Sequence, residues 1–225
     1  PLLLVWFVIR IRRSGRYALR RIPAFDALRG LLSTATEQGK RIHFSPGTAG
    51  IGGDSTAIVA AGIVVLRYLA DQAASLGINP KVTVADPTAL ILAQNTIYQA
   101  HREHGDTRNY EPTSVQFIAP QPLAYAAGAQ DRINDERMSA NVMVGHFAEE
   151  YLLLAEPGAQ RDLLQVAGSD IVNTQPFIVA TSQNPLLGEE AFAAGAYLAE
   201  RPEHIASLRL QDVLRVLIVV AIVIG

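Results

Sequence analysis

The sequence predicts an α/β fold: a doubly wound, mainly parallel, Rossmann-like sheet flanked by two transmembrane helix segments. Two observations predict this class. Short apolar runs alternate with longer helical patterns, which is typical of parallel strands joined by crossover helices. Both ends of the chain are apolar, while 49% hydrophobic residues over 225 residues suit one good-sized core.

Four runs are strong strand candidates, because each is short, apolar and bounded by Gly, Pro or Asp. They are RIHFS (41–45), KVTVAD (81–86), VQFIAP (115–120) and ANVMVG (140–145). Weaker candidates follow at QVAG (165–168) and FIVAT (177–181).

Helical patterns fill the intervals between these strands. They cover residues 54–76, 87–104, 122–135 and 187–200. Gly77 follows the first pattern, where a glycine can end a helix in the left-handed conformation. Asp86 and Pro87 open the second pattern as a cap followed by an N1 proline.

The two apolar ends predict membrane anchoring. PLLLVWFVI (1–9) and VLIVVAIVIG (216–225) each supply about half of the ~20 residues that a spanning helix needs. We therefore expect the chain to be a piece of a longer protein, cut inside two transmembrane helices. The alternative is a pair of helices that pack on the domain's own core.

The distribution of positive charge predicts which side of the membrane the domain faces. Six arginines lie in residues 1–21, which hold no acidic residue, and such clusters mark the cytoplasmic side of a membrane span. We predict the end of a transmembrane helix with a basic juxtamembrane segment at 1–21, a cytoplasmic α/β domain at 22–205, and the start of a second transmembrane helix at 206–225. The protein is then expected in the inner (cytoplasmic) membrane, with the lipid bilayer as a partner and the soluble domain facing the cytoplasm.

Composition excludes some classes of function. Of 19 basic residues, 13 lie beyond residue 21 against 21 acidic ones, and only two are lysines, which argues against nucleic acid as a partner. The absence of cysteine excludes disulfides and thiolate metal sites.

A glycine-rich turn, SPGTAGIGGDSTA (45–57), joins the first predicted strand to the first predicted helix. Backbone N–H groups and the dipole at a helix N-terminus can bind an anion. The alternative is a structural turn whose glycines allow positive φ and in which Ser55 is the helix N-cap. The candidate ligand-binding residues are Gly50, Gly52, Gly53, Asp54, Ser55, Asp86 and His146.

No catalytic or nucleotide motif is complete in this turn. A dinucleotide fingerprint starting at Gly50 would put Ser55 where its third glycine belongs, and a P-loop would need a lysine. Asp86 could hold a ribose, but capping the helix that starts at Pro87 is the simpler role. Gly53-Asp54-Ser55 resembles the start of a hydrolase family, yet the Asp-x-x-His of that family is missing.

His146 marks a second candidate region. It follows the predicted strand 140–145, and ligands of doubly wound sheets collect outside the carboxyl ends of the strands. We therefore expect several polar residues to face one crevice at this edge: Thr48, Asp86, His146, Glu149 and Thr181.

We predict no metal site, no catalytic residue and no cofactor. His101 and His104 lie three residues apart near the end of the predicted helix 87–104, where we expect a solvated helix terminus. Two ligands on one exposed turn do not make a site.

Several blocks resemble a bacterial membrane-protein family of unknown function. They are RIPAFDAL (21–28), VTVADPT (82–88), FIAPQPLAYAAG (117–128), ANVMVGHFAEEYLLLAE (140–156) and NPLLGEEAFAAGAYL (184–198). The resemblance implies an α/β domain between membrane helices and no assigned activity.

The leading hypothesis is a membrane-anchored cytoplasmic domain with a structural or assembly role that self-associates as a homo-oligomer. Small-residue runs at 191–199 and 123–129 let backbones pack closely, within the core or between subunits. The alternative is a nucleotide- or anion-binding domain, and so potentially an enzyme, that holds a small-molecule ligand at the turn 47–55.

Overall fold

The computed structural model describes residues 20–135, 137–199, 205 and 218–222. Its strands form one sheet in which every neighbouring pair is parallel, in the order β3-β2-β1-β4-β5-β6. The predicted Rossmann-like α/β fold is therefore confirmed. The strands are β1 (Arg41–Gly47), β2 (Lys81–Val84), β3 (Val115–Phe117), β4 (Met138–His146), β5 (Leu164–Ser169) and β6 (Asn184–Leu186).

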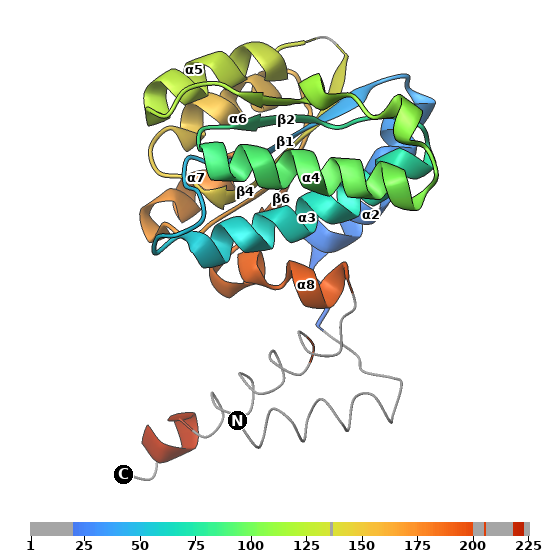
Figure 1. Cartoon of the computed structure of the whole chain (residues 1–225). Coiled ribbons are helices and arrows are strands. Elements are labelled where there is room, and N and C mark those ends of the chain that lie inside the picture. The colour runs from blue at the N-terminus through green and yellow to red at the C-terminus, as the bar shows by residue number, and fades with distance from the viewer. Residues whose placement is uncertain (1–19, 136, 200–204, 206–217, 223–225) are drawn as a thin grey trace, which may run out of the picture.

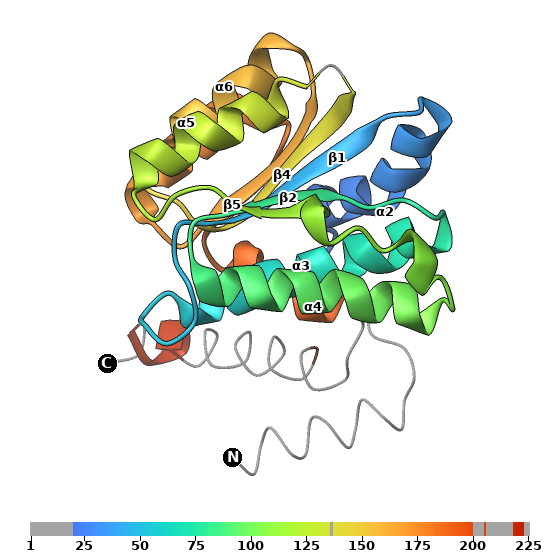
Figure 2. The same cartoon turned by 45° about the horizontal axis from the view of Figure 1, so that its top comes forward.

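Helices cover both faces of this sheet (Figures 1 and 2). On one face lie α2 (Pro23–Glu37), α3 (Thr56–Ser75), α4 (Pro87–Glu103), the 3-10 helix η4 (Gly188–Phe192) and α8 (Ala194–Tyr197). On the other lie α5 (Pro122–Ile133), α6 (Tyr151–Gln160) and α7 (Gln175–Thr181). Three more 3-10 turns complete the described elements: η1 (Thr107–Asn109), η2 (Pro112–Ser114) and η3 (Val172–Thr174).

The four central strands, β2, β1, β4 and β5, are buried on both faces, but the two faces differ in polarity. In β1, Ile42 and Phe44 point into the apolar core under α2, α3 and α4. His43 and Ser45 alternate with them and point to the opposite face, because successive side chains of a strand point to opposite sides. The strand side chains under α2, α3 and α4 are thus apolar, whereas the opposite face includes a buried polar row.

One helix among the described residues, α3, is long and apolar enough to cross a membrane. Its side chains Val65, Leu66 and Leu69 are fully buried in the core shared with β1 and β4. The core helix of an α/β domain meets the same criteria of length and composition, so α3 is weak evidence for a span.

Some predicted elements differ from the structure. Residues 177–181, predicted as a strand, belong to α7, and the sixth strand is β6 instead. The predicted helix 187–200 is two short pieces, η4 and α8. Two further helices, α2 and α6, have no counterpart among the predicted elements.

The predicted transmembrane segments lie outside the described residues, apart from the turn 218–222. This turn is helical, and its large apolar side chains are exposed. They are Ile218, Val219, Val220 and Ile222, with exposed fractions of 58%, 59%, 45% and 75%.

Candidate functional site

The candidate site lies at the carboxyl ends of β1 and β4. These central strands are neighbours, and the helices that follow them, α3 and α6, lie on opposite faces of the sheet. Such a switch point opens a crevice in doubly wound folds. In Figure 1 the turn after β1 lies at the end of the molecule where α3 and α4 begin.

The two strand ends approach too closely for side chains. A Cβ on Gly47 would lie 2.0 Å from the carbonyl oxygen of His146, and a Cβ on Gly145 would lie 1.7 Å from that of Pro46. Gly47 also has a φ of 86°, a conformation that favours glycine. The Thr48 amide donates to the His146 carbonyl at 2.9 Å, which ties the two loops together.

His146 is the centre of a three-residue cluster. Its Nδ1 lies 3.0 Å from Ser55 Oγ and 2.9 Å from Asp170 Oδ1. Ser55 precedes α3, His146 ends β4, and Asp170 follows β5, so the cluster joins three loops. Ser55 and His146, two of the candidate ligand-binding residues, thus lie together, whereas Asp170 was not among the candidates.

This cluster does not have the geometry of a serine-hydrolase triad. In a triad the carboxylate and the serine contact different ring nitrogens, so that the imidazole can accept the hydroxyl proton on one side and be oriented on the other. Here Ser55 and Asp170 share Nδ1. A proton on Nδ1 donates to Asp170, and Nε2 makes no hydrogen bond with the described residues. His146 therefore keeps one ring nitrogen available at a partly exposed position.

Ser55 occupies the N-cap position of α3, but its side chain makes no capping hydrogen bond there. The simple N-cap explanation of this serine is wrong in that respect, because its hydroxyl turns to His146 instead. Thr56 supports the start of the helix: its Oγ1 accepts from the Gly52 amide at 2.9 Å and donates to the Gly53 carbonyl at 2.6 Å.

The glycine-rich turn packs on the start of α4. A Cβ on Gly50 would lie 2.0 Å from Asp86 Oδ1, and the Ile51 amide donates to Thr88 Oγ1 at 2.9 Å. Gly52 has a φ of 116°, whereas Gly53 has no positive φ, and a Cβ added to it would meet no atom within 4 Å. Asp54 lies beside them as an exposed side chain.

Asp86 caps α4, as expected. Its Oδ1 accepts from the Thr88 amide at 2.7 Å and from the Ala89 amide at 3.3 Å. Partial burial raises the pKa of this carboxyl, but the hydrogen bonds from Thr88 and Ala89 outweigh it and lower the pKa below its usual value. Since these donors hold Oδ1, the carboxylate stabilises the start of the helix.

The residues predicted to face one crevice at this edge come together only in part. Thr48 lies beside His146 and donates to Glu150 Oε1 at 3.3 Å, and Glu150 is almost completely buried. Thr181 contacts the Tyr151 hydroxyl at 2.8 Å, within the layer of α6 and α7. The side chain of Glu149 makes no hydrogen bond with the described residues.

No group of three or more potential metal ligands occurs within the described ranges. His101, expected at a solvated helix end, is fully buried, and its Nε2 lies 3.0 Å from Asn79 Oδ1. His104 is partly exposed and pairs with Asp71 at 2.9 Å. The two histidines therefore have separate structural partners.

One protein-family model matches nearly the whole chain, residues 2–225, and its description is a domain of unknown function, DUF6754. No curated protein and no solved structure matches the chain.

Proposed function

The chain belongs to the DUF6754 family, whose function is unknown. We propose that it forms a membrane-anchored cytoplasmic domain with a structural or assembly role. The observation that carries the proposal is the position of the two ends of the folded domain. The Tyr197 hydroxyl donates to the Arg20 carbonyl at 2.6 Å, so the chain enters and leaves the domain at one place.

This arrangement suits a domain held at a membrane by both ends. In the sequence, the apolar runs 1–9 and 216–225 precede and follow these neighbouring points, and two spans from neighbouring points can enter one bilayer. The arginines of residues 1–21 would then lie at the cytoplasmic surface. The exposed apolar turn 218–222 also favours a lipid or protein environment over water.

The chemistry of the carboxyl edge supports a structural role. Most polar groups there satisfy one another: Ser55 and Asp170 hold His146, and Asp86 caps α4. No arginine or lysine belongs to these contacts, and the exposed carboxylate of Asp54 beside the start of α3 would repel an anion there. The glycine turn is best explained as a junction between two loops and two helices.

We also propose that the domain self-associates, but through other residues than the small-residue runs considered in the sequence. The run 191–199 packs inside the domain, where Ala191, Ala194 and Ala196 are buried. In the run 123–129, Tyr125 and Ala126 are buried too. A subunit contact would use exposed apolar side chains instead, and Val172 and Val179 are 73% and 55% exposed around α7.

Membrane extraction followed by native mass measurement tests the proposal. We expect the chain to stay in the membrane pellet after an alkaline carbonate wash and to appear as a homo-oligomer in detergent. Val172→Ser and Val179→Ser should lower the oligomer fraction if α7 forms the contact, with Ser33→Ala on α2 as a control. Release of the wild-type chain by carbonate would contradict anchoring, and a monomer at all concentrations would contradict assembly.

A second candidate function is ligand binding at the carboxyl edge, and the available Nε2 of His146 favours it. A nitrogen oriented through Nδ1 by a carboxylate can accept a proton or a hydrogen bond from a small molecule. Thermal unfolding with and without nucleotides separates the two functions. A rise in melting temperature with nucleotide, larger in Asp54→Ala because a nearby negative charge is removed, would favour binding.

A further inference from the structure

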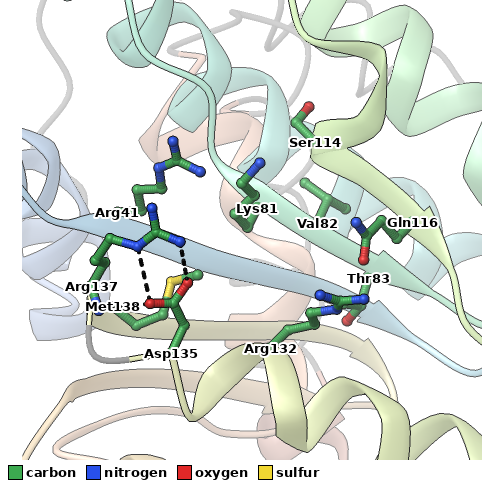
Figure 3. A pocket seen from close by; sticks show the side chains of 10 residues that line it. All are labelled: Arg41, Lys81, Val82, Thr83, Ser114, Gln116, Arg132, Asp135, Arg137 and Met138. Atoms are coloured by element: carbon green, nitrogen blue, oxygen red, sulfur yellow. Dashed lines mark hydrogen bonds and ion pairs between the residues drawn. The ribbon is translucent and has the colours of Figure 1, made fainter.

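A pocket lies at the opposite edge of the sheet, where the strands begin (Figure 3). Arg41 starts β1, Lys81 starts β2 and Met138 starts β4, and all three line it. The pocket has a volume of about 170 Å³. Because β1 is seven residues long, this pocket is roughly 20 Å from the His146 cluster and does not depend on the function proposed above.

The pocket is strongly cationic, although the chain beyond residue 21 is acidic. Among the described residues that line it are four cations, Arg41, Lys81, Arg132 and Arg137, and one carboxylate, that of Asp135. In Figure 3, Arg41, Lys81 and Arg137 lie on one side of the pocket, and Arg132 lies beside Gln116 on another. The lining comes from strands and from the end of α5, so separate elements bring these charges together.

Two of the cations already have partners. Arg137 makes a forked pair with Asp135, with Nη2 to Oδ2 at 2.9 Å and Nε to Oδ1 at 3.2 Å. Lys81 Nζ lies 3.1 Å from Glu111 Oε2. The guanidinium groups of Arg41 and Arg132 make no hydrogen bond or ion pair with any described residue. Two positive charges at the pocket are therefore not compensated by direct contacts.

A buried polar atom at the same pocket also lacks a partner. Ser114, which precedes β3, is 1% exposed, and its Oγ makes no hydrogen bond within the described part of the chain. Buried hydroxyl groups nearly always have a partner, so an orphan at a pocket indicates a missing one. Arg41 is itself only partly exposed, and a half-buried guanidinium gains most from a bound anion.

We propose that this pocket binds the phosphate group of a small phosphate monoester. Two arginines without a direct partner match one dianion, since a phosphate monoester carries about −1.5 to −2 charges at neutral pH. Guanidinium groups bind phosphate oxygens in a forked geometry, and Ser114 lines the same pocket. The volume is below the roughly 300 Å³ at which pockets for drug-sized ligands begin, so it suits a small headgroup rather than a dinucleotide.

Calorimetric titration of the purified full chain with glycerol 3-phosphate tests the proposal, and inorganic phosphate serves as a second probe. We expect saturable binding that weakens about tenfold in Arg41→Gln and in Arg132→Gln, because each removes one charge-assisted contact. Arg102→Gln, an exposed arginine that does not line the pocket, should bind as the wild type does. Arg132 is exposed, so its substitution should leave the melting temperature unchanged even if Arg41→Gln lowers it.

A vesicle arm identifies the source of the phosphate. Vesicles of phosphatidylcholine with phosphatidic acid present the same monoester on a lipid, and pure phosphatidylcholine vesicles are the control. If the soluble monoester binds and its binding depends on Arg41 and Arg132, the ligand is a metabolite. If only the phosphatidic acid vesicles bind, and this binding depends on the same two arginines, the ligand is a lipid headgroup. No binding to any phosphate probe, or binding that is equal in the wild type and both variants, would overturn the proposal.

Discussion

The Tyr197 hydroxyl donates to the Arg20 carbonyl at 2.6 Å, which joins the first described residue of the domain to the last short helix. The Tyr197 ring also stacks on Phe25 in α2, with the ring centroids 4.9 Å apart. Arg29 in α2 adds a hydrogen bond from Nη2 to the Tyr197 carbonyl at 2.8 Å. The domain is thus closed at the point from which both ends of the chain depart.

Tyr197→Phe should remove the hydrogen bond and keep the stacking. We expect a loss of about 1 kcal/mol in the free energy of unfolding, the usual net value of one hydrogen bond. Tyr197→Ala should cost more, about 2–4 kcal/mol, because the ring contact with Phe25 is lost as well. Denaturant unfolding of the purified variants measures both values, and equal losses in the two variants would contradict this separation.

A buried polar row crosses the sheet on the face under α5 and α6. His43 Nδ1 lies 2.8 Å from Asn141 Oδ1, and His43 Nε2 lies 2.8 Å from Thr83 Oγ1. Asn141 Nδ2 donates to Gln165 Oε1 at 3.2 Å, so its Oδ1 is the acceptor, and the proton of neutral His43 is on Nδ1. Burial lowers the pKa of His43 to about 4, and the hydrogen bond with Asn141, which raises the pKa, offsets only part of this effect.

This lowered pKa predicts a loss of stability in mild acid. Above about pH 6.5 His43 is neutral in both the folded and the unfolded chain. As the pH falls from about 6.5 to 4, the unfolded chain takes up a proton that the folded chain does not, so the free energy of unfolding falls by up to about 3 kcal/mol. Unfolding of wild type and His43→Gln across this range measures the effect.

The free energy of unfolding of His43→Gln should change less steeply with pH than that of the wild type. His104→Gln is the matched control, because His104 is partly exposed and its removal leaves the buried row intact. Equal slopes in wild type and His43→Gln would show that His43 does not titrate as its burial requires.

Three of the four glycines of the turn should respond differently to alanine. Gly50→Ala places a methyl group against the Asp86 carboxylate and should disturb the cap of α4, at about 1–2 kcal/mol. Gly52→Ala has free space but a φ of 116°, so backbone strain of about 1 kcal/mol or more is expected. Gly53→Ala should change stability by less than about 0.5 kcal/mol. Thermal unfolding ranks the three, and a large effect at Gly53 alone would contradict the described turn.

Ser55 should not behave as an activated nucleophile. It shares Nδ1 of His146 with Asp170, so no base is placed to take its proton while the carboxylate orients the ring. A fluorophosphonate probe should therefore label the wild type no more than Ser55→Ala. Stoichiometric labelling that disappears in Ser55→Ala would require a different arrangement of this cluster.

The sequence predicted the central sheet well, because buried parallel strands appear as short apolar runs between turn residues. It also predicted the positive φ of Gly77 and the cap formed by Asp86. FIVAT (177–181) was mistaken for a strand because a short apolar run has no distinctive period, and Pro176 places it in the first turns of a helix instead. Pro157 lies inside α6 and hides its helical pattern.

The candidate sites were harder to predict than the fold. Asp170 follows a weakly predicted strand, and only the order of the strands brings it to His146. The cationic pocket has no local motif either, since Arg41, Lys81 and Arg132 are far apart in sequence. Their common feature, a position at the starts of strands or the end of a helix on one edge, becomes visible only once the sheet order is known.

Labelling of single cysteines in intact cells tests membrane anchoring most directly. These 225 residues hold no cysteine, so Ser33→Cys on α2 and Thr113→Cys on η2 each introduce a single exposed thiol into this segment. We predict that a membrane-impermeant maleimide labels both positions only after the cells are permeabilised, and that the labelled chain is found in the membrane fraction. Labelling in intact cells would place the domain outside the cytoplasm, and recovery of the chain in the soluble fraction would contradict the anchoring itself.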